Sequence, residues 1–187
     1  MTPEAKRVGA FEAVAPFPAS ARVKLAPVGP LARILFRGPA EAAASASRVF
    51  GPVLDTAPMR ANQAGGRAAL WLGPDEWLMI ARDGDLDAIL RALAAEPMPP
   101  HSAVDVSHRN TGLVLSGPKA ADVLAAGCPL DLDPAAFAVG TATRTLLGKA
   151  EIVLWRQAAD RFHVECWRSF APYVHAFLAE AALEYTA

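Results

Sequence analysis

The sequence predicts an α+β fold in which a strand–helix–hairpin–helix unit occurs twice, with antiparallel sheets covered on one side by helices. The first observation is a Gly-Pro pair after a short apolar run in each half, Gly38-Pro39 and Gly117-Pro118. The second is a helical segment after each pair that ends at a glycine, Gly51 or Gly127. Proline suits the first helical position and glycine the position past the last turn, so both halves are predicted to share one element order.

Residues 1–30 are predicted to form an extended N-terminal arm. The five prolines of this stretch follow no sustained periodicity, and proline fixes φ and removes a backbone donor. We expect at most a short strand near Arg22 to Leu25. Two interpretations of the arm stay open, a loose terminus or a segment that lies on a partner chain.

A first α+β lobe is predicted over residues 31–100. Pro74 of Gly73-Pro74-Asp75 stands where a type I turn favours proline, which predicts a tight hairpin. Asp85 is expected to cap the following helix, because a carboxylate there can accept bonds from the first-turn N–H groups. The expected elements are a strand over 31–37, a helix ending at Phe50, a hairpin over 68–81, and a helix with an apolar stripe over 86–93.

A second α+β lobe is predicted over residues 101–187. Phe162, Val164 and Cys166 alternate with polar or exposed neighbours, the pattern of a half-buried strand. Ser169 is expected to cap the last helix. The expected elements are a strand over 113–116, a helix over 119–126, a hairpin over 150–167, and a helix with an apolar face over 170–178.

Composition excludes several classes of protein. The formal net charge of −1, with acids and bases interleaved, argues against nucleic acid as a partner. A membrane span needs about 18 apolar residues in a row, and no such stretch occurs. The N-terminal residues do not resemble a secretory signal, and two cysteines are too few for a disulfide scaffold. We therefore expect a soluble cytoplasmic protein.

The residue types that could carry catalysis are not expected to form a site. Asp105 and Ser107 would share one face of a strand while His108 points to the other, so a turn between strands is the preferred interpretation. Cys128 follows a helix end, where the helix dipole disfavours a thiolate. Cys166 and His163 would face opposite sides of one strand and could not share a metal ion. We predict no catalytic residue and no metal site.

A partner contact is the functional feature that the residues themselves favour. The four tryptophans, Trp71, Trp77, Trp155 and Trp167, all fall on the two predicted hairpins. Most are expected in the core, and one or two as anchors at a subunit contact. The exposed pair we expect at a partner surface is Trp167 with Arg168.

The run from Val104 to Leu124 resembles the aminomethyltransferase (glycine cleavage T-protein) superfamily. There an Asp-x-Ser-His run, here Asp105 to His108, leads into a strand that ends in Ser-Gly-Pro and a helix. Within that superfamily the gamma-subunit family of heterotetrameric sarcosine oxidase is more similar. Further runs that carry this resemblance are 105–110 (DVSHRN), 128–132 (CPLDL), 143–151 (TRTLLGKAE), 167–171 (WRSFA) and, more weakly, 71–80 (WLGPDEWLMI).

The resemblance implies a T-protein-like, folate-binding-type fold and an accessory subunit without catalytic residues. Such a complex demethylates sarcosine oxidatively to glycine, producing hydrogen peroxide and, with tetrahydrofolate, 5,10-methylenetetrahydrofolate. The implied partners are alpha, beta and delta subunits, and FAD, FMN, NAD, zinc and tetrahydrofolate would be bound through those subunits rather than by this chain. His108 and Arg109 join Trp167 and Arg168 as candidates for the partner interface.

Folate-using members of the superfamily carry acidic residues where this chain has Ala150 and Glu151. Glu151 is therefore the one candidate for a folate contact, next to Lys149. The alternative hypothesis is a stand-alone folate-binding or folate-dependent aminomethyl-transfer protein. A general interaction module of another complex is a third.

Overall fold

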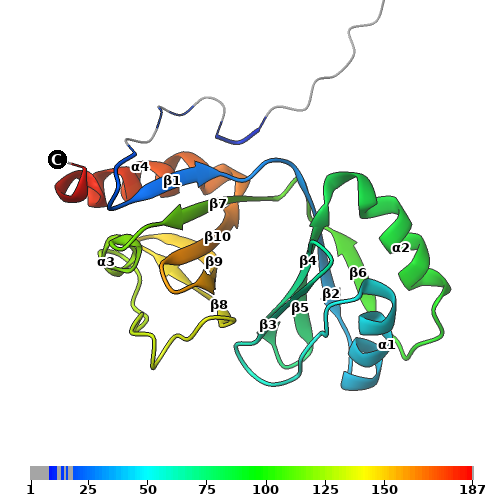
Figure 1. Ribbon diagram of the computed structural model, residues 1–187. Coiled ribbons are helices and arrows are strands. Elements are labelled where there is room, and N and C mark those ends of the chain that lie inside the picture. The colour runs from blue at the N-terminus through cyan, green and yellow to red at the C-terminus, as the bar shows by residue number, and fades with distance from the viewer. Residues whose placement is uncertain (1–8, 12–13, 15, 17–18, 187) are drawn as a thin grey trace, which may run out of the picture.

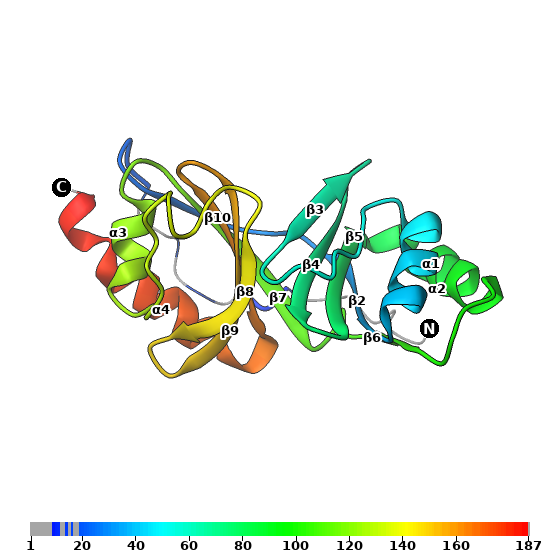
Figure 2. The same cartoon turned by 90° about the horizontal axis from the view of Figure 1, so that it is seen from below.

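Two antiparallel sheets of five strands pack face to face in the computed structural model, which describes residues 9–11, 14, 16 and 19–186 (Figures 1 and 2). In spatial order the first sheet is β3 (Ala61–Ala64), β4 (Arg67–Gly73), β5 (Glu76–Arg82), β2 (Leu31–Arg37) and β6 (Ser102–Asp105). The second is β1 (Lys24–Pro27), β7 (Asn110–Ser116), β10 (Arg161–Trp167), β9 (Ala150–Ala158) and β8 (Ala142–Leu147).

Helices cover the outer face of each sheet, so the molecule has four layers (Figure 2). The helices α1 and α2 pack on the first sheet, and α3 and α4 pack on the second. Their bounds are α1 (Ala40–Phe50), α2 (Leu86–Ala95), α3 (Ala120–Ala125) and α4 (Ala171–Ala181), with single 3₁₀ turns η1 (Asp83–Asp85), η2 (Arg168–Phe170) and η3 (Leu183–Tyr185). None of the helices in the described part of the chain has the length and apolar character to span a membrane.

The predicted α+β duplication is confirmed. The order β2-α1-β3-β4-β5-α2 in the first half is repeated as β7-α3-β8-β9-β10-α4 in the second. Each hairpin is extended by one strand that the sequence did not predict, β3 or β8. The reason in β3 is that its four residues are partly or fully exposed and show no apolar alternation that would reveal a strand.

The two halves exchange their leading strands. β1 precedes β2 in the chain but pairs with β7, with Leu25 opposite Leu115. β6 precedes β7 but pairs with β2, with Val104 opposite Leu35. Figure 1 shows β1 beside β7, away from the sheet of β2. The division into an arm of 1–30 and lobes of 31–100 and 101–187 stays a prediction for folding units, but each sheet contains a strand from across these boundaries.

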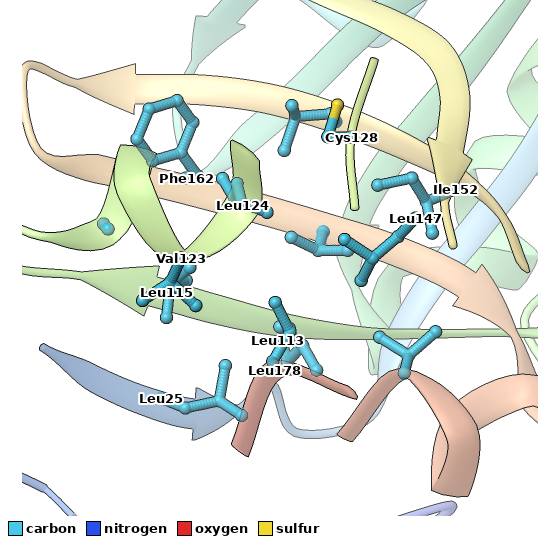
Figure 3. Packing of buried hydrophobic residues seen from close by; sticks show 14 of the residues in the cluster. Leu25, Leu113, Leu115, Val123, Leu124, Cys128, Leu147, Ile152, Phe162 and Leu178 are labelled. Atoms are coloured by element: carbon cyan, nitrogen blue, oxygen red, sulfur yellow. The ribbon is translucent and has the colours of Figure 1, made fainter. Parts of the chain in front are cut away.

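Three apolar clusters hold the layers together. The cluster under α3 and α4 brings Leu25 of β1 together with Leu113 of β7 and Leu178 of α4 (Figure 3). A second cluster lies under α1 and α2. The third fills the space between the sheets and consists of Ala68, Leu70, Leu72, Leu78, Ile80, Val106, Ala142, Val153 and Trp155.

The prediction that β10 is half-buried is wrong, because the cluster between the sheets covers its second face as well. Phe162 and Val164 face the helices as expected, but His163 and Glu165 on the other face are also buried, at 4% and 1% exposure. The polar face of the strand is covered because the second sheet packs against the first. Charged residues on that face must therefore find partners inside the protein.

The predicted side-chain caps do not form: Asp85 does stand at the N-cap position of α2, whereas the N-cap of α4 is Phe170 rather than Ser169. Asp85 and Ser169 lie inside the 3₁₀ turns η1 and η2, and neither α2 nor α4 has a side-chain cap bond. The 3₁₀ turn itself carries the chain from strand to helix, and the Asp85 carboxylate instead lies 3.5 Å from Arg67 Nη2. By contrast, Gly51 ends α1 with a φ of 105°, as its position predicts.

Part of the N-terminal arm packs on its own chain. Phe11 is buried at 7% exposure in the cluster under α4, and Val23, just before β1, is fully buried there. The alternative of an arm lying on a partner chain stays a prediction. Residues 1–8, 12–13, 15 and 17–18 of the arm lie outside the described residues.

Candidate functional site

The four residues predicted for a partner interface come together at one end of the second sheet. Trp167 is the last residue of β10 and stands opposite Asn110, the first residue of β7. The Arg168 N–H donates to the carbonyl oxygen of Arg109 at 2.7 Å. His108, Arg109, Trp167 and Arg168 are all exposed, so this end of the antiparallel β7–β10 pair presents residues that are far apart in sequence.

Trp167 lies close to one cation and one further aromatic ring. The Arg109 guanidinium lies 5.9 Å from the centre of the Trp167 ring, and Phe170 of η2 is 6.3 Å away on a tilted ring plane. Trp167 keeps 45% of its surface exposed and Phe170 36%. We call His108, Arg109, Trp167, Arg168 and Phe170 the aromatic–arginine surface. Tryptophan and arginine are enriched at the energetic centres of protein interfaces.

Glu151 is itself exposed near the start of β9, on the same strand face as Val153 and Trp155, and it lines a small cavity together with Arg109 and Trp167. Its carboxylate is 3.8 Å from Arg144 Nε, and Arg144 also bonds Glu76 of the first sheet at 2.8 Å. The cavity that Glu151 lines has a volume of about 20 Å³. A space of that size holds about one water molecule, far less than the volume of a pterin ring.

An ion pair inside the protein joins the two sheets, and the sequence did not predict it. Arg33 of β2 donates to Glu165 of β10 through Nε at 2.6 Å and through Nη2 at 2.9 Å. His163 Nε2 lies 2.7 Å from the same carboxylate. The side chains are exposed by 3% for Arg33, 5% for His163 and 0% for Glu165. We call these three residues the inter-sheet triad.

The charge state of Glu165 follows from its partners. Burial alone would raise the pKa of this carboxyl, but the hydrogen bonds and charges of His163 and Arg33 hold the pKa below its ordinary value. Glu165 is therefore ionised and paired. Its bonds link β2 and β10, which gives the triad a structural part in fixing how the two sheets face each other.

Gly112 of β7 makes room for the triad. A Cβ at this position would lie 2.5 Å from Glu165 Oε1 and 3.0 Å from His163 Nε2. Only a glycine lets the backbone pass so close to the buried carboxylate. The sequence signal that could have indicated the triad was a glycine within a strand together with an arginine inside the apolar run of β2.

Asp105, Ser107 and His108 belong to the turn between β6 and β7, as predicted, and do not form a catalytic site. Asp105 Oδ1 accepts the Ser107 N–H at 2.9 Å, and Ser107 Oγ accepts the Arg33 N–H at 2.9 Å. His108 has turned to the surface. Ser107 therefore ties the turn after β6 to β2 of the first sheet.

Both cysteines are buried free thiols. Burial and then the nearby Glu165 charge raise the pKa of Cys166 to about 12, so its thiol stays protonated. Cys166 points into the helix-side cluster while His163 lies on the opposite face, as their spacing predicted. Within the described residues, no group of three or more His, Cys, Asp or Glu side chains could hold a metal ion.

A family model described as "Sarcosine oxidase, gamma subunit family" matches residues 37–184. A sarcosine oxidase subunit gamma from Corynebacterium sp. (strain U-96) is 36% identical over 129 residues, which cover 68% of this chain and 62% of the relative. One from Arthrobacter sp is 38% identical over 127 residues, 67% of this chain and 61% of the relative. The chain thus spans about three fifths of the length of these curated relatives.

Two solved structures are similar. A heterotetrameric sarcosine oxidase from Corynebacterium sp. U-96, in complex with pyrrole 2-carboxylate, contains a chain that matches with a TM-score of 0.82 and 32% identity, over 91% of this chain and 89% of that one. Aminomethyltransferase T of the glycine cleavage system from Bartonella henselae matches with a TM-score of 0.64 and 16% identity, over 89% of this chain and 47% of that one. The second match shows a shared fold, as the T-protein resemblance predicted.

Proposed function

The chain belongs to the sarcosine oxidase gamma subunit family, and from this we propose that it is the accessory, non-catalytic gamma subunit of a heterotetrameric sarcosine oxidase. The assembled enzyme would demethylate sarcosine oxidatively to glycine, with formation of hydrogen peroxide and 5,10-methylenetetrahydrofolate. Its alpha, beta and delta subunits would hold FAD, FMN, NAD, zinc and tetrahydrofolate. This chain would contribute through assembly.

The observation that carries the proposal is the aromatic–arginine surface. Arg109 holds the Trp167 ring in place while almost half of that ring stays exposed. Tyr173, at the start of α4, is a further exposed aromatic side chain, at 36% exposure. A large exposed aromatic side chain beside arginine is the composition of an interface anchor. We therefore place the contact to a partner subunit at this end of the second sheet.

The experiment is co-expression of the tagged chain with the other three subunits, followed by affinity purification. Trp167→Ala combined with Arg168→Glu is expected to weaken recovery of the partners about tenfold or more, because an interface anchor typically contributes 2 kcal/mol or above. The matched control combines Val53→Ala and Arg37→Glu, which lie in the first half and are also exposed. Recovery that falls equally in both variants, or in neither, would contradict this placement.

The alternative, a stand-alone folate-dependent protein, depends on Glu151. That carboxylate is occupied by Arg144 and lines a cavity of only about 20 Å³. Pterin recognition needs a pocket with several buried polar partners. The geometry around Glu151 therefore favours the accessory-subunit proposal.

A further inference from the structure

Two cationic side chains and a hydroxyl lie side by side at the end of the second sheet that is opposite Trp167. Lys24 of β1 stands across from Ser116 of β7, and Arg161 of β10 stands across from Ser116 on its other side. Directly opposed residues of antiparallel strands place their side chains on the same face, with Cβ atoms about 5 Å apart. The three side chains therefore form a row across one face of the sheet. We call Lys24, Ser116 and Arg161 the cationic row.

The positive charges of the cationic row have no acidic partner within the part of the chain that the structure describes. Arg161 Nε donates to the amide oxygen of Gln157 at 3.0 Å, and this partner is neutral. Lys24 is exposed and forms no ion pair with any described residue. A hollow of about 310 Å³ borders the row, and its described lining contains all three members but no Asp or Glu. Two positive charges beside a hydroxyl suit an anion with two negative charges.

A cavity of about 370 Å³, lined by residues of both sheets, adjoins this hollow. The two spaces share Val28, Val114 and Arg161. Buried Trp155 and His163 both line the cavity, with their ring centres 5.9 Å apart. Further apolar residues of its lining are Leu31, Ala64, Ala68 and Ile80. Small-molecule sites in proteins have volumes of roughly 300–1,000 Å³, so an aromatic ring has room beside the cationic row, in contact with Trp155.

We propose that the cationic row binds the phosphate group of a small aromatic phosphate monoester, whose ring lies in the adjoining cavity against Trp155. Such a phosphate carries about −1.5 to −2 charges at pH 7, which the two cations match. The planar Arg161 guanidinium can bond two phosphate oxygens, Lys24 supplies a point charge, and Ser116 supplies a hydroxyl donor. The site goes beyond the proposed function. It lies at the other end of β10 from the aromatic–arginine surface, so the two proposals can fail separately.

Calorimetric titration of the full chain with phenyl phosphate tests the proposal. Phenyl phosphate should bind one to one. Benzoate, which has the same ring but a single charge, should bind about tenfold more weakly because it loses a hydrogen bond between charged groups. Inorganic phosphate should also bind about tenfold more weakly, because it has no ring to bury. No saturable heat with phenyl phosphate up to about 10 mM, or equal binding of benzoate or of inorganic phosphate, would overturn the proposal.

Variants locate the site. Lys24→Gln and Arg161→Gln should each weaken the binding of phenyl phosphate about tenfold, since each removes one charged donor. Arg91→Gln is the matched control, because this arginine is exposed on α2 and lies outside both spaces, so binding should not change. Thermal unfolding checks that each variant is folded. Unchanged binding in either Lys24→Gln or Arg161→Gln, or an equal loss in Arg91→Gln, would overturn the assignment to the cationic row.

Discussion

Glu165 and Arg33 form an ion pair with almost no solvent contact. Removing one partner alone therefore lowers the stability of the fold much more than replacing both. Taking away the carboxylate leaves a buried guanidinium without a counter-charge, and such a change typically destabilises by 3–5 kcal/mol, whereas replacing a whole buried pair can be neutral. The pair fixes how the sheets face each other more than it adds net stability. The exposed pair Arg37–Asp75, at 54% and 57% side-chain exposure, provides the comparison.

We predict that Glu165→Gln lowers the free energy of unfolding by about 3 kcal/mol or more. Asp75→Asn, in the exposed pair, should change it by less than about 1 kcal/mol. Urea unfolding followed by far-ultraviolet circular dichroism measures both. Equal effects of the two variants would show that the inter-sheet pair is not buried as described.

The same carboxylate predicts a pH dependence of stability. Because the folded pKa of Glu165 lies below its unfolded value, the stabilisation is present above the unfolded pKa and is lost as pH falls through the folded pKa. The difference in unfolding free energy between wild type and Glu165→Gln should thus be larger at neutral pH than at pH values below about 5. A difference that instead grew on acidification would contradict the charge state assigned to Glu165.

At the scale of the elements, the exchange of leading strands is the feature with consequences for folding. Leu25 is encoded in the first half, yet it packs at 6% exposure in the helix-side cluster of the second sheet. Neighbouring Lys24 points outward. The two halves therefore share structure that neither could complete alone.

Leu25→Ala is predicted to destabilise the chain by about 2–4 kcal/mol, because it leaves a cavity in a well-packed cluster. Lys24→Ala on the same strand should cost less than about 0.5 kcal/mol, as is usual for exposed positions. Thermal unfolding compares the two. If both variants unfolded like wild type, β1 would not be paired with β7 as shown.

Turn residues and apolar periodicity in the sequence predicted several helices and strands correctly. The turn at Gly38-Pro39 and the stop at Gly51 placed α1 correctly, and the alternation in β10 showed which of its residues face the helices. The exchange of β1 and β6 could not be predicted in this way. Strand partners are set by packing over long sequence distances, and no local period records which sheet a four-residue strand joins.

Part of the candidate site could likewise be predicted from neighbouring residues, and part could not. Trp167 and Arg168 are adjacent in the chain, so their common surface was open to prediction, and Arg109 joins them through the β7–β10 pairing. The inter-sheet triad was missed because Arg33 and Glu165 are 132 positions apart. They meet because the two sheets pack face to face. The sequence predicted helices on one side of each sheet and did not indicate what covers the other side.

The whole molecule is a four-layer α+β unit with an exposed aromatic and basic end, and its family relatives are gamma subunits. Exposed aromatic side chains of this size are stabilised when a partner covers them. Our central claim is therefore that the chain works as an assembly subunit of a sarcosine-oxidising complex.

Affinity purification of the tagged chain from its native cell tests that claim most directly. We expect larger subunits to co-elute in constant ratio, the eluate to show flavin absorbance, and hydrogen peroxide to form only when sarcosine is added. The chain purified alone should show no flavin absorbance and form no hydrogen peroxide from sarcosine. Recovery of the chain without any flavin-containing partner, under conditions where the native complex is intact, would contradict the account.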